Sequence, residues 1–377
     1  MKRVQSLIRA LLLVLLMAAS LSTSMLFAEM LVRFAAPQTL ILRRPDVWYG
    51  IDGLGWDRAP NLDTTVNFGG AGPVRLITDD EGNRIGTAGK VHNPEIKILA
   101  IGDSFVEALQ VDYEQTMTWL LQESVRDRTG KRTEIQCAGV GGWNPNQYLI
   151  RSKSRLRHSA YDLQLVFVYL GNDIEISKVD ALSRREPAPY HYVRLPRTIT
   201  HEEIVAALLY PANDWLETSS QAFILFRNRM QPLLARLGLT AEQLPWIVSR
   251  STLDNSCWDI TVDILREIEA NGAANRVPTL FVLIPPDYMF ADMPLRELGY
   301  DPRRMDLTQP YRLMSEKMTA AGLRIVDLTP AFQETQRNGT SCYGTVDTHL
   351  NAGGHRVAAA VVLPYVIDAL REARGGR

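Results

Sequence analysis

Ser104 occupies a position typical of a catalytic nucleophile. It lies in the stretch "ILAIGDSFVEALQV", where an apolar run of strand length is followed by Gly-Asp-Ser and then by a segment with helical periodicity. A hydroxyl at such a position lies at the carboxyl edge of a sheet, near a helix N-terminus whose N–H groups favour negative charge. The same pattern also fits an ordinary turn or helix cap. Ser104 therefore needs partners before it indicates catalysis.

Candidate partners follow apolar runs further along the chain. The stretch "CAGVGGWNPNQY" contains Gly142, which can present its backbone N–H, and "YLGND" contains Asn172, whose amide can donate to a developing oxyanion. The stretch "DTHLNAGG" contains Asp347 and His349, a carboxylate beside an imidazole, as in a general base and the group that orients it. Each fragment alone also fits a turn or cap. Their common position after strands of one sheet favours a site that attacks carbonyl groups with Ser104.

A regular alternation of strands and helices is expected from residue 96 onward. The apolar strands are continuous, which predicts burial on both faces, and the alternation predicts parallel order with right-handed crossovers. We therefore expect an α/β fold with a doubly wound parallel sheet. The strand segments are "IKILAIGD", "TEIQCAGV", "LQLVFVYLG", "PTLFVLIPP" and "RIVDLT", and the helical segments are 116–129, 144–160, 259–276, 306–322 and 352–373.

Composition divides the chain into three parts. Residues 1–36 form an apolar N-terminal segment, residues 37–95 a Pro-, Gly- and Asp-rich irregular lead-in with a hairpin or two, and residues 96–377 the α/β domain. After the third strand, an insertion at about 177–256 contains the helical segments "EEIVAALLY", "AFILFRNRMQPLLARL" and "TAEQLPWIV". Because ligands bind beyond the carboxyl ends of parallel strands, this insertion is expected to cover the site.

Taken together, the blocks resemble the SGNH, or GDSL-type, hydrolases. "GDSF" contains Ser104, the glycine block contains Gly142, "GND" contains Gly171 and Asn172, and "DTHLN" contains His349. The resemblance extends from about residue 95 to the C-terminus, apart from the insertion. It implies a three-layer flavodoxin-like fold and hydrolysis of carboxylic esters by a Ser-His-Asp triad, without a metal or organic cofactor. It also implies an oxyanion hole formed by the N–H groups of Ser104 and Gly142 and the amide of Asn172.

The acid of the triad departs from the common family pattern. That pattern has Asp three residues before the His, where this chain has Val346, while Asp347 stands two residues before His349. The shorter spacing resembles alginate acetyltransferase-like branches of the family, so Asp347 is the expected acid. Asp327, at the end of "RIVDLT", is the spare candidate and is otherwise a helix cap. His355 is expected to face elsewhere.

The N-terminal segment has the features of a membrane helix. Lys2, Arg3 and Arg9 precede an uncharged run at residues 10–28, which would extend about 28 Å as a helix, close to the hydrocarbon thickness of a bilayer. We expect an uncleaved single-pass anchor, with a signal peptide processed near Ser20 as the alternative. In both cases the remaining chain is extracytoplasmic. The "EGNRIG" segment resembles bacterial envelope members of the family, so the expected location is the inner membrane with a periplasmic catalytic domain.

Composition limits the kinds of partner and ligand expected for this chain. In a chain of 377 residues, 41 basic residues balance 42 acidic ones, so no nucleic-acid partner is expected. No His, Cys or carboxylate cluster has the spacing of metal ligands. Of the three cysteines, Cys137 is expected to be a buried small hydrophobe. Cys257 and Cys342 either form a disulfide in an oxidising compartment or stay unpaired.

Three functions remain open from the sequence. The first is a serine esterase that acts on small acylated molecules or on O-acyl groups of envelope glycans, with Trp143 either stacking on a sugar ring or packing beneath the insertion. The second is an O-acyltransferase that works with membrane or envelope-biosynthesis partner proteins. The third is a non-catalytic envelope binding protein that retains the fold. The intact set of Ser, Gly, Asn and His favours the enzyme.

Overall fold

The structure is a computed structural model that describes residues 2–38, 40, 45–51, 53–68, 72–174, 212, 215–236, 244–290, 295–296, 300–344 and 348–375. The chain forms two compact units. The smaller contains Met1–Ile41 and Thr198–Thr240, and the larger contains Leu42–Arg197 and Ala241–Arg377.

The larger unit is built on an eight-stranded sheet in the order β10-β9-β8-β6-β7-β5-β4-β3. The strands expected from the continuous apolar runs are all present and pair in parallel. They are β6 (Ile96–Ile101), β7 (Thr133–Cys137), β8 (Leu163–Tyr169), β9 (Thr279–Ile284) and β10 (Ile325–Asp327). β7 and β8 lie on opposite sides of β6. The carboxyl end of β6 is therefore the switch point at which sheets of this kind bind ligands.

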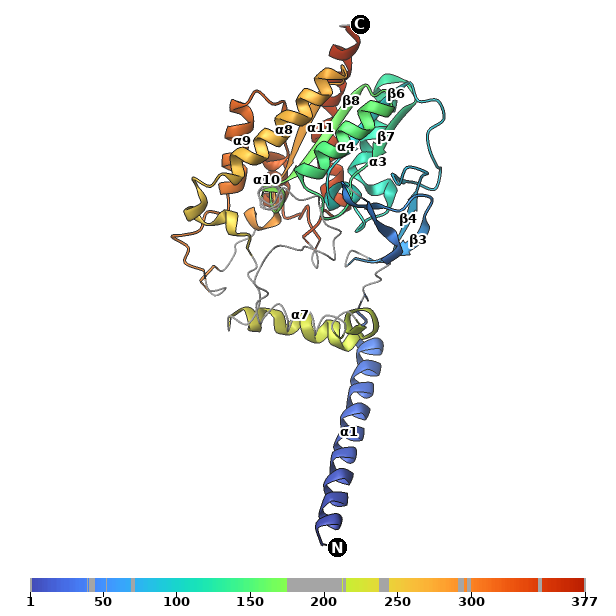
Figure 1. Ribbon diagram of the computed structural model, residues 1–377, viewed down its shortest axis with the longest axis vertical. Helices are drawn as coiled ribbons and strands as arrows, with labels where there is room; N and C mark the ends of the chain where they lie inside the picture. Colours follow the sequence, from blue (N-terminus) through green and yellow to red (C-terminus); the bar gives the residue numbers. More distant parts are fainter. Residues whose placement is uncertain are drawn as a thin grey trace. The chain divides into compact units, whose positions relative to one another are not determined.

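Helices cover both faces of the sheet. Ile96 and Ile98 of β6 belong to one core cluster, whereas Leu99 and Ile101 belong to another, because successive side chains of a strand point to opposite faces. The first cluster includes residues of α3 (Met117–Thr129), α10 (Thr329–Arg337) and α11 (Ala352–Gly375), and the second includes residues of α4 (Pro145–His158), α8 (Cys257–Ala274) and α9 (Gln309–Ala320). Figure 1 shows α4 and α8 side by side over the sheet. The expected three-layer doubly wound fold is confirmed.

The lead-in is more regular than its composition predicts. β1 (Trp48–Ile51) and β2 (Gly55–Arg58) form an antiparallel hairpin. β3 (Asp63–Val66), β4 (Val74–Thr78) and β5 (Arg84–Ile85) continue the main sheet beyond β7 as antiparallel strands. The expected hairpins are thus present, but part of the lead-in belongs to the sheet of the α/β domain. The sequence did not reveal this, because β5 pairs with a strand that is distant in the chain.

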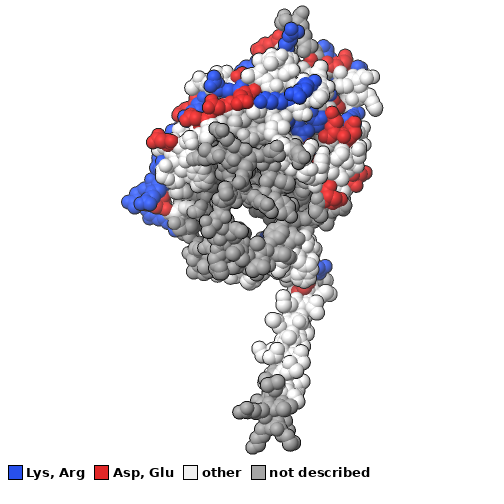
Figure 2. Space-filling model, in the orientation of Figure 1, with Lys and Arg blue, Asp and Glu red and all other residues white. Residues whose placement is uncertain are grey.

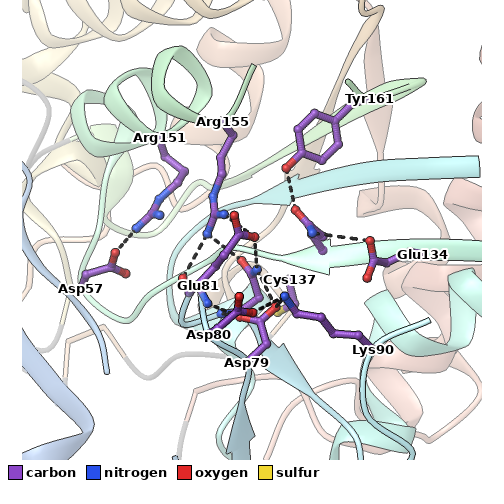
Figure 3. Close-up of polar contacts among 12 residues, drawn as sticks. Asp57, Asp79, Asp80, Glu81, Lys90, Glu134, Cys137, Arg151, Arg155 and Tyr161 are labelled. Atoms are coloured by element: carbon purple, nitrogen blue, oxygen red, sulfur yellow. Dashed lines mark hydrogen bonds and ion pairs between the residues drawn. The ribbon is translucent and has the colours of Figure 1, made fainter. Parts of the chain in front are cut away.

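Charged side chains of α4 hold the lead-in against the domain (Figure 3). Arg151 pairs with Asp57 of β2, and both side chains are largely buried. Arg155, one turn further along α4, pairs with Glu81 at 2.6 Å and donates to the side-chain oxygen of Asn83 at 3.0 Å. Since residues four apart share one face of a helix, a single face of α4 contacts two separate segments of the lead-in.

The smaller unit combines the N-terminal helix with part of the insertion. α1 (Lys2–Ala35) contains an apolar window at Leu11–Ala35 with a mean hydropathy of 2.2, none of which is buried. Figure 2 shows its described side chains almost without charge. By length and composition this helix is able to cross a membrane, which is a property that membrane spans and signal sequences share. The buried core helix of a soluble domain is excluded, because this helix is exposed.

One of the expected insertion helices is described in full, as α7 (Gln221–Arg236). The segment 202–210 lies outside the described residues. The segment 240–248 is described only from residue 244, where it contains the short 3₁₀ helix η3 (Trp246–Val248). Further 3₁₀ helices are η1 (Pro45–Val47), η2 (Tyr113–Gln115), η4 (Arg250–Thr252) and η5 (Asp287–Met289).

The cysteines correct one expectation. All three are free and buried. Cys257 opens α8 and lies in the core cluster on one face of the sheet, whereas Cys342 lies in the cluster on the other face. The proposed Cys257–Cys342 disulfide is therefore wrong, because the sheet separates the two thiols. Cys137 is a buried core residue, as expected.

Candidate active site

Ser104 begins α2 (Ser104–Glu107), a single helical turn close after β6. Asp103 caps this turn, since its Oδ1 accepts the N–H of Phe105 at 2.9 Å. The turn ends at Ala108, whose backbone is left-handed and whose N–H donates to the Ser104 carbonyl at 2.8 Å. These contacts hold the serine at the carboxyl edge of the sheet, as the sequence predicted.

His349 faces this serine. Its Nε2 lies 2.7 Å from Ser104 Oγ, although the two residues are 245 positions apart. The imidazole centroid lies 4.9 Å from that of the Phe105 ring, which stacks on Tyr169 at 4.0 Å. This aromatic contact supports the imidazole from one side. The pair has the geometry in which an imidazole removes the proton of a hydroxyl.

The loop that contains His349 is held by its own hydrogen bonds. The N–H of Gly344 donates to the His349 carbonyl at 2.9 Å. The Asn351 side chain donates to the Tyr343 carbonyl at 2.8 Å and accepts from the N–H of Gly354 at 2.9 Å. Asn351 therefore closes the loop and also caps α11.

Gly141 and Gly142 bring the loop after β7 beside the serine. A Cβ on Gly141 would lie only 2.8 Å from a carboxylate oxygen of Glu107, which is too close for an ordinary contact, and 3.8 Å from Ser104 Cβ, which is an ordinary contact. Gly142 has a φ of +79°, in the left-handed region that glycine adopts without strain. Gly141 is thus restricted by the space beside Glu107, and Gly142 by its backbone conformation. Gly142 belongs to the loop beside the nucleophile, and its N–H as an oxyanion donor stays a prediction.

Asn172 follows β8, which is hydrogen-bonded directly to β6. The turn depends on its neighbour Asp173, whose Oδ2 accepts the N–H of Tyr169 at 2.9 Å. The hydroxyl of Tyr148 donates to both Asp173 oxygens, at 3.0 and 3.1 Å. Asp173 therefore holds the backbone on which Asn172 lies. The role of Asn172 as an oxyanion donor stays a prediction.

Three carboxylates near the serine are buried. Asp103 and Glu107 flank Ser104 in the chain, and Asp173 follows β8, the strand that pairs with β6. Burial raises the pKa of each of them, most strongly that of Asp173, which the charge of Asp103 raises further. Arg58 opposes the shift at Glu107. A positive charge on His349 lowers the pKa of Asp103. By reciprocity, an ionised Asp103 stabilises the protonated form of His349.

The two candidates for the triad acid have different outcomes. Asp347 lies outside the described residues, so its contact with His349 stays a prediction. Asp327 has other partners: its Oδ1 accepts the N–H of Thr329 at 2.9 Å at the start of α10, and its Oδ2 accepts the hydroxyl of Tyr311 at 2.9 Å. Asp327 lies one residue before the N-cap Leu328 and satisfies a free N–H at the start of α10, in agreement with its interpretation as a capping residue.

His355 faces away from the nucleophile, as expected. It is buried in α11, and its Nδ1 accepts the N–H of Met117 at 3.2 Å. Burial lowers its pKa to about 3, with smaller contributions from the charges of Arg84 and His349. Within the described ranges, no three His, Cys, Asp or Glu side chains form a group that could hold a metal ion.

Trp143 does not face a substrate. It is fully buried, its indole N–H donates to the Trp56 carbonyl at 2.9 Å, and the Arg151 guanidinium lies 4.8 Å from its ring. Stacking on a sugar is excluded by this burial. The packing interpretation holds, although Trp143 contacts the lead-in.

Sequence reasoning missed the residues that support the glycine loop. Glu107 had a local signal, since it is the acidic residue three positions after Ser104 in the otherwise apolar turn "SFVEAL". Trp48, Trp56 and Arg58 had none. They lie in the lead-in, and no local pattern relates them to the nucleophile.

No family model and no curated protein matches this chain. Solved structures similar to it include a lipolytic protein of the G-D-S-L family from Veillonella parvula, with 10% identity and a TM-score of 0.37 over 71% of this chain and 97% of that one. An acetyl xylan esterase is 15% identical, with a TM-score of 0.40 over 72% of this chain and 100% of the esterase. A GDSL-like lipase from Bacteroides thetaiotaomicron has 11% identity and a TM-score of 0.36 over 72% and 88%. Since these TM-scores lie below 0.5, the functional argument rests on the geometry of the site.

Proposed function

We propose that the chain is a serine hydrolase of carboxylic esters in which Ser104 is the nucleophile and His349 the general base. The observation that supports this is the 2.7 Å contact between His349 Nε2 and Ser104 Oγ. A hydroxyl is a weak nucleophile until a neighbouring base takes its proton. The proximity of the Gly141 loop to Ser104 supports the assignment of a backbone oxyanion donor to this loop.

The reaction proceeds by double displacement. Ser104 Oγ bonds to the ester carbonyl carbon while His349 takes the hydroxyl proton, and collapse of the tetrahedral intermediate passes that proton to the departing alcohol. Water then attacks the acyl-enzyme with the same base. We assign the oxyanion to the N–H groups of Ser104 and Gly142 and to the amide of Asn172. Asp347 would hold the imidazole tautomer.

A fluorophosphonate probe tests the nucleophile before any substrate is known. The full-length protein should acquire one adduct, mapped to Ser104 by peptide mass spectrometry. Ser104→Ala should acquire none, and His349→Ala should react far more slowly with unchanged circular dichroism. A folded wild-type protein that stays unlabelled would reject the esterase and favour the non-catalytic binding protein.

We propose O-acyl groups of an envelope glycan as the natural substrate. Because Trp143 is buried and does not stack on a sugar, this proposal rests on the expected location of the protein in the cell envelope. Release of free carboxylic acid from an acylated glycan would support it. A preference for acyl transfer once acceptor glycan is added would instead identify the O-acyltransferase.

We also propose that α1 is retained as a single-pass anchor of the inner membrane. Glu29, just after the uncharged run, accepts the N–H groups of Gln221 and Ala222, both at 3.0 Å, and thereby caps α7. Arg33 pairs with Glu29 at 2.6 Å and donates to the Ser219 carbonyl at 3.0 Å. The C-terminal end of α1 thus packs as part of a folded unit, which supports retention of this segment.

Cell fractionation and intact-mass measurement test the anchor. The protein should stay in the membrane fraction after a high-salt wash and keep the mass of its N-terminal residues. Recovery of a shortened, soluble periplasmic form would identify a signal peptide and leave the esterase proposal untouched.

A further inference from the structure

Glu107 and Trp56 hold the backbone on the two sides of Gly141. Glu107 Oε2 accepts the N–H of Gly141 at 2.8 Å. The indole N–H of Trp56 donates to the carbonyl of the same residue at 2.9 Å, across 85 positions of sequence. Two consecutive peptide planes are therefore fixed, the first through its N–H and the second through its C=O.

The second of these planes includes the proposed oxyanion donor. The carbonyl of Gly141 and the N–H of Gly142 belong to one planar peptide group, and in a trans peptide they point in opposite directions. This bond is trans. Whatever orients the Gly141 carbonyl therefore also orients the Gly142 N–H. The indole of Trp56 performs that function from the side opposite to the donor.

Glu107 is itself held by residues of the lead-in, the segment to which Trp56 belongs. Glu107 Oε1 accepts the indole N–H of Trp48 at 3.1 Å and lies 3.4 Å from the Arg58 guanidinium. Arg58 is fully buried and donates to the carbonyls of Gly82 at 2.8 Å and Cys137 at 3.0 Å. Each carboxylate oxygen of Glu107 thus accepts at least one hydrogen bond. The carboxylate therefore has little freedom to rotate away from the loop.

We infer that Trp56 and Glu107 are positioning residues for the oxyanion hole, which hold the two peptide planes at Gly141 so that the Gly142 N–H faces the carbonyl oxygen of a bound ester. This inference rests on the proposed ester hydrolysis. It gives the lead-in a part in that reaction through the backbone that it positions.

Trp56→Phe is the sharpest variant, because it removes the indole N–H and keeps an aromatic ring. An oxyanion donor acts on the transition state more than on the bound substrate. We expect kcat on p-nitrophenyl acetate to fall about 10-fold or more with KM unchanged, since misplacement by about 1 Å can cost about 100-fold. Glu107→Gln should act in the same direction, but it also leaves Arg58 without a charged partner.

Trp258→Phe is the matched control. Trp258 is fully buried and, like Trp56, donates its indole N–H to a backbone carbonyl, that of Thr252, at 2.9 Å. This variant should lower the melting temperature and leave kcat unchanged. A Trp56→Phe protein that loses melting temperature but keeps the wild-type kcat would overturn the inference and leave a purely structural role.

Labelling separates this failure from that of the proposed function. The full-length wild type in detergent micelles is first treated with a fluorophosphonate. An adduct on Ser104 together with a wild-type kcat in Trp56→Phe rejects the positioning role alone. A folded wild type without an adduct rejects the esterase, and the positioning role with it.

Discussion

Two regions of the larger unit meet at Ser104, and they contribute in different ways. The carboxyl edge of the parallel strands, together with the loop before α11, supplies the groups that we propose to react. The lead-in supplies Trp48, Trp56 and Arg58, which hydrogen-bond to backbone or to Glu107. The reacting residues directly follow their own strands or precede their own helix. The supporting residues reach the site only through contacts between distant segments.

The residues that react and the residues that set the geometry of the site are therefore separable by substitution. Substitutions at the parallel edge should abolish turnover and spare stability, because the reacting side chains contribute little to the core. Substitutions in the lead-in should lower stability and turnover together, because its buried polar groups have no solvent to replace a lost partner.

The largest effect is expected at the parallel edge, for Asp347→Asn. If Asp347 holds His349, the amide favours the wrong tautomer of the imidazole, a change that lowered turnover about 10⁴-fold in a serine protease. Folding should be unchanged. The measurement is kcat on one activated ester, with circular dichroism as a check on folding.

Asp327→Asn is the control for that variant. Asparagine caps helices about as well as aspartate, so turnover and stability should both change little. If the Asp327 variant is inactive while Asp347→Asn stays active, the triad must be redrawn around β10.

Arg58→Met should have the largest effect within the lead-in. It leaves the buried Glu107 without its cationic partner and removes the donors to the Gly82 and Cys137 carbonyls. Breaking a buried ion pair in this way costs about 3–5 kcal/mol. Urea denaturation measures the loss in the free energy of unfolding.

The exposed pair of the same region provides the comparison. Arg75 contacts Asp63 at 2.7 Å with both side chains largely in solvent, where ion pairs contribute little to stability. Arg75→Met should therefore leave the denaturation midpoint almost unchanged. Equal losses for the two variants would mean that burial of Arg58 does not matter.

Asn172→Ala should affect turnover and not stability. Loss of one oxyanion donor costs about 2.7–4 kcal/mol in the barrier, with KM little changed because the donor acts in the transition state. Steady-state kinetics on an activated ester measure the effect. Asn338→Ala, at the exposed end of α10, serves as the control. An unchanged kcat in the Asn172 variant would remove this residue from the oxyanion hole.

A pH-dependent effect on stability is expected at His355, which is buried in α11. Burial lowers its pKa to about 3, and Arg84 of the lead-in contributes. The fold therefore favours the neutral form of His355. The stability that this gives is fully present above about pH 6.5, the ordinary pKa of histidine. That contribution is lost as the pH falls toward 3, by at most about 1.4 kcal/mol per pH unit.

Replacement of His355 by Gln should remove this part of the pH dependence. Urea midpoints between pH 7 and pH 4 should fall less steeply for the variant than for the wild type. His158→Gln, at an exposed position of α4, should retain the wild-type slope. Parallel slopes for the wild type and the His355 variant would show that His355 does not titrate with unfolding.

The sequence by itself determined the layered core. Continuous apolar runs and helical periods are local properties, so they placed β6 to β10 and the main helices within a few residues of their observed bounds. It also determined the reacting pair. Because parallel strands end at one edge, a serine after β6 and a histidine before α11 were expected to meet, and they lie 2.7 Å apart.

Tertiary structure alone decided which residues support that pair. The bond from Trp56 to Gly141 spans 85 positions, and the antiparallel extension of the sheet joins Arg84 to Cys137. No period or motif within either segment encodes such pairings, since each segment satisfies its own local pattern without the other. The same reason explains why the sequence could not decide whether Cys257 and Cys342 form a disulfide. Spacing along the chain cannot tell which face of the sheet a residue occupies, and the two thiols lie on opposite faces.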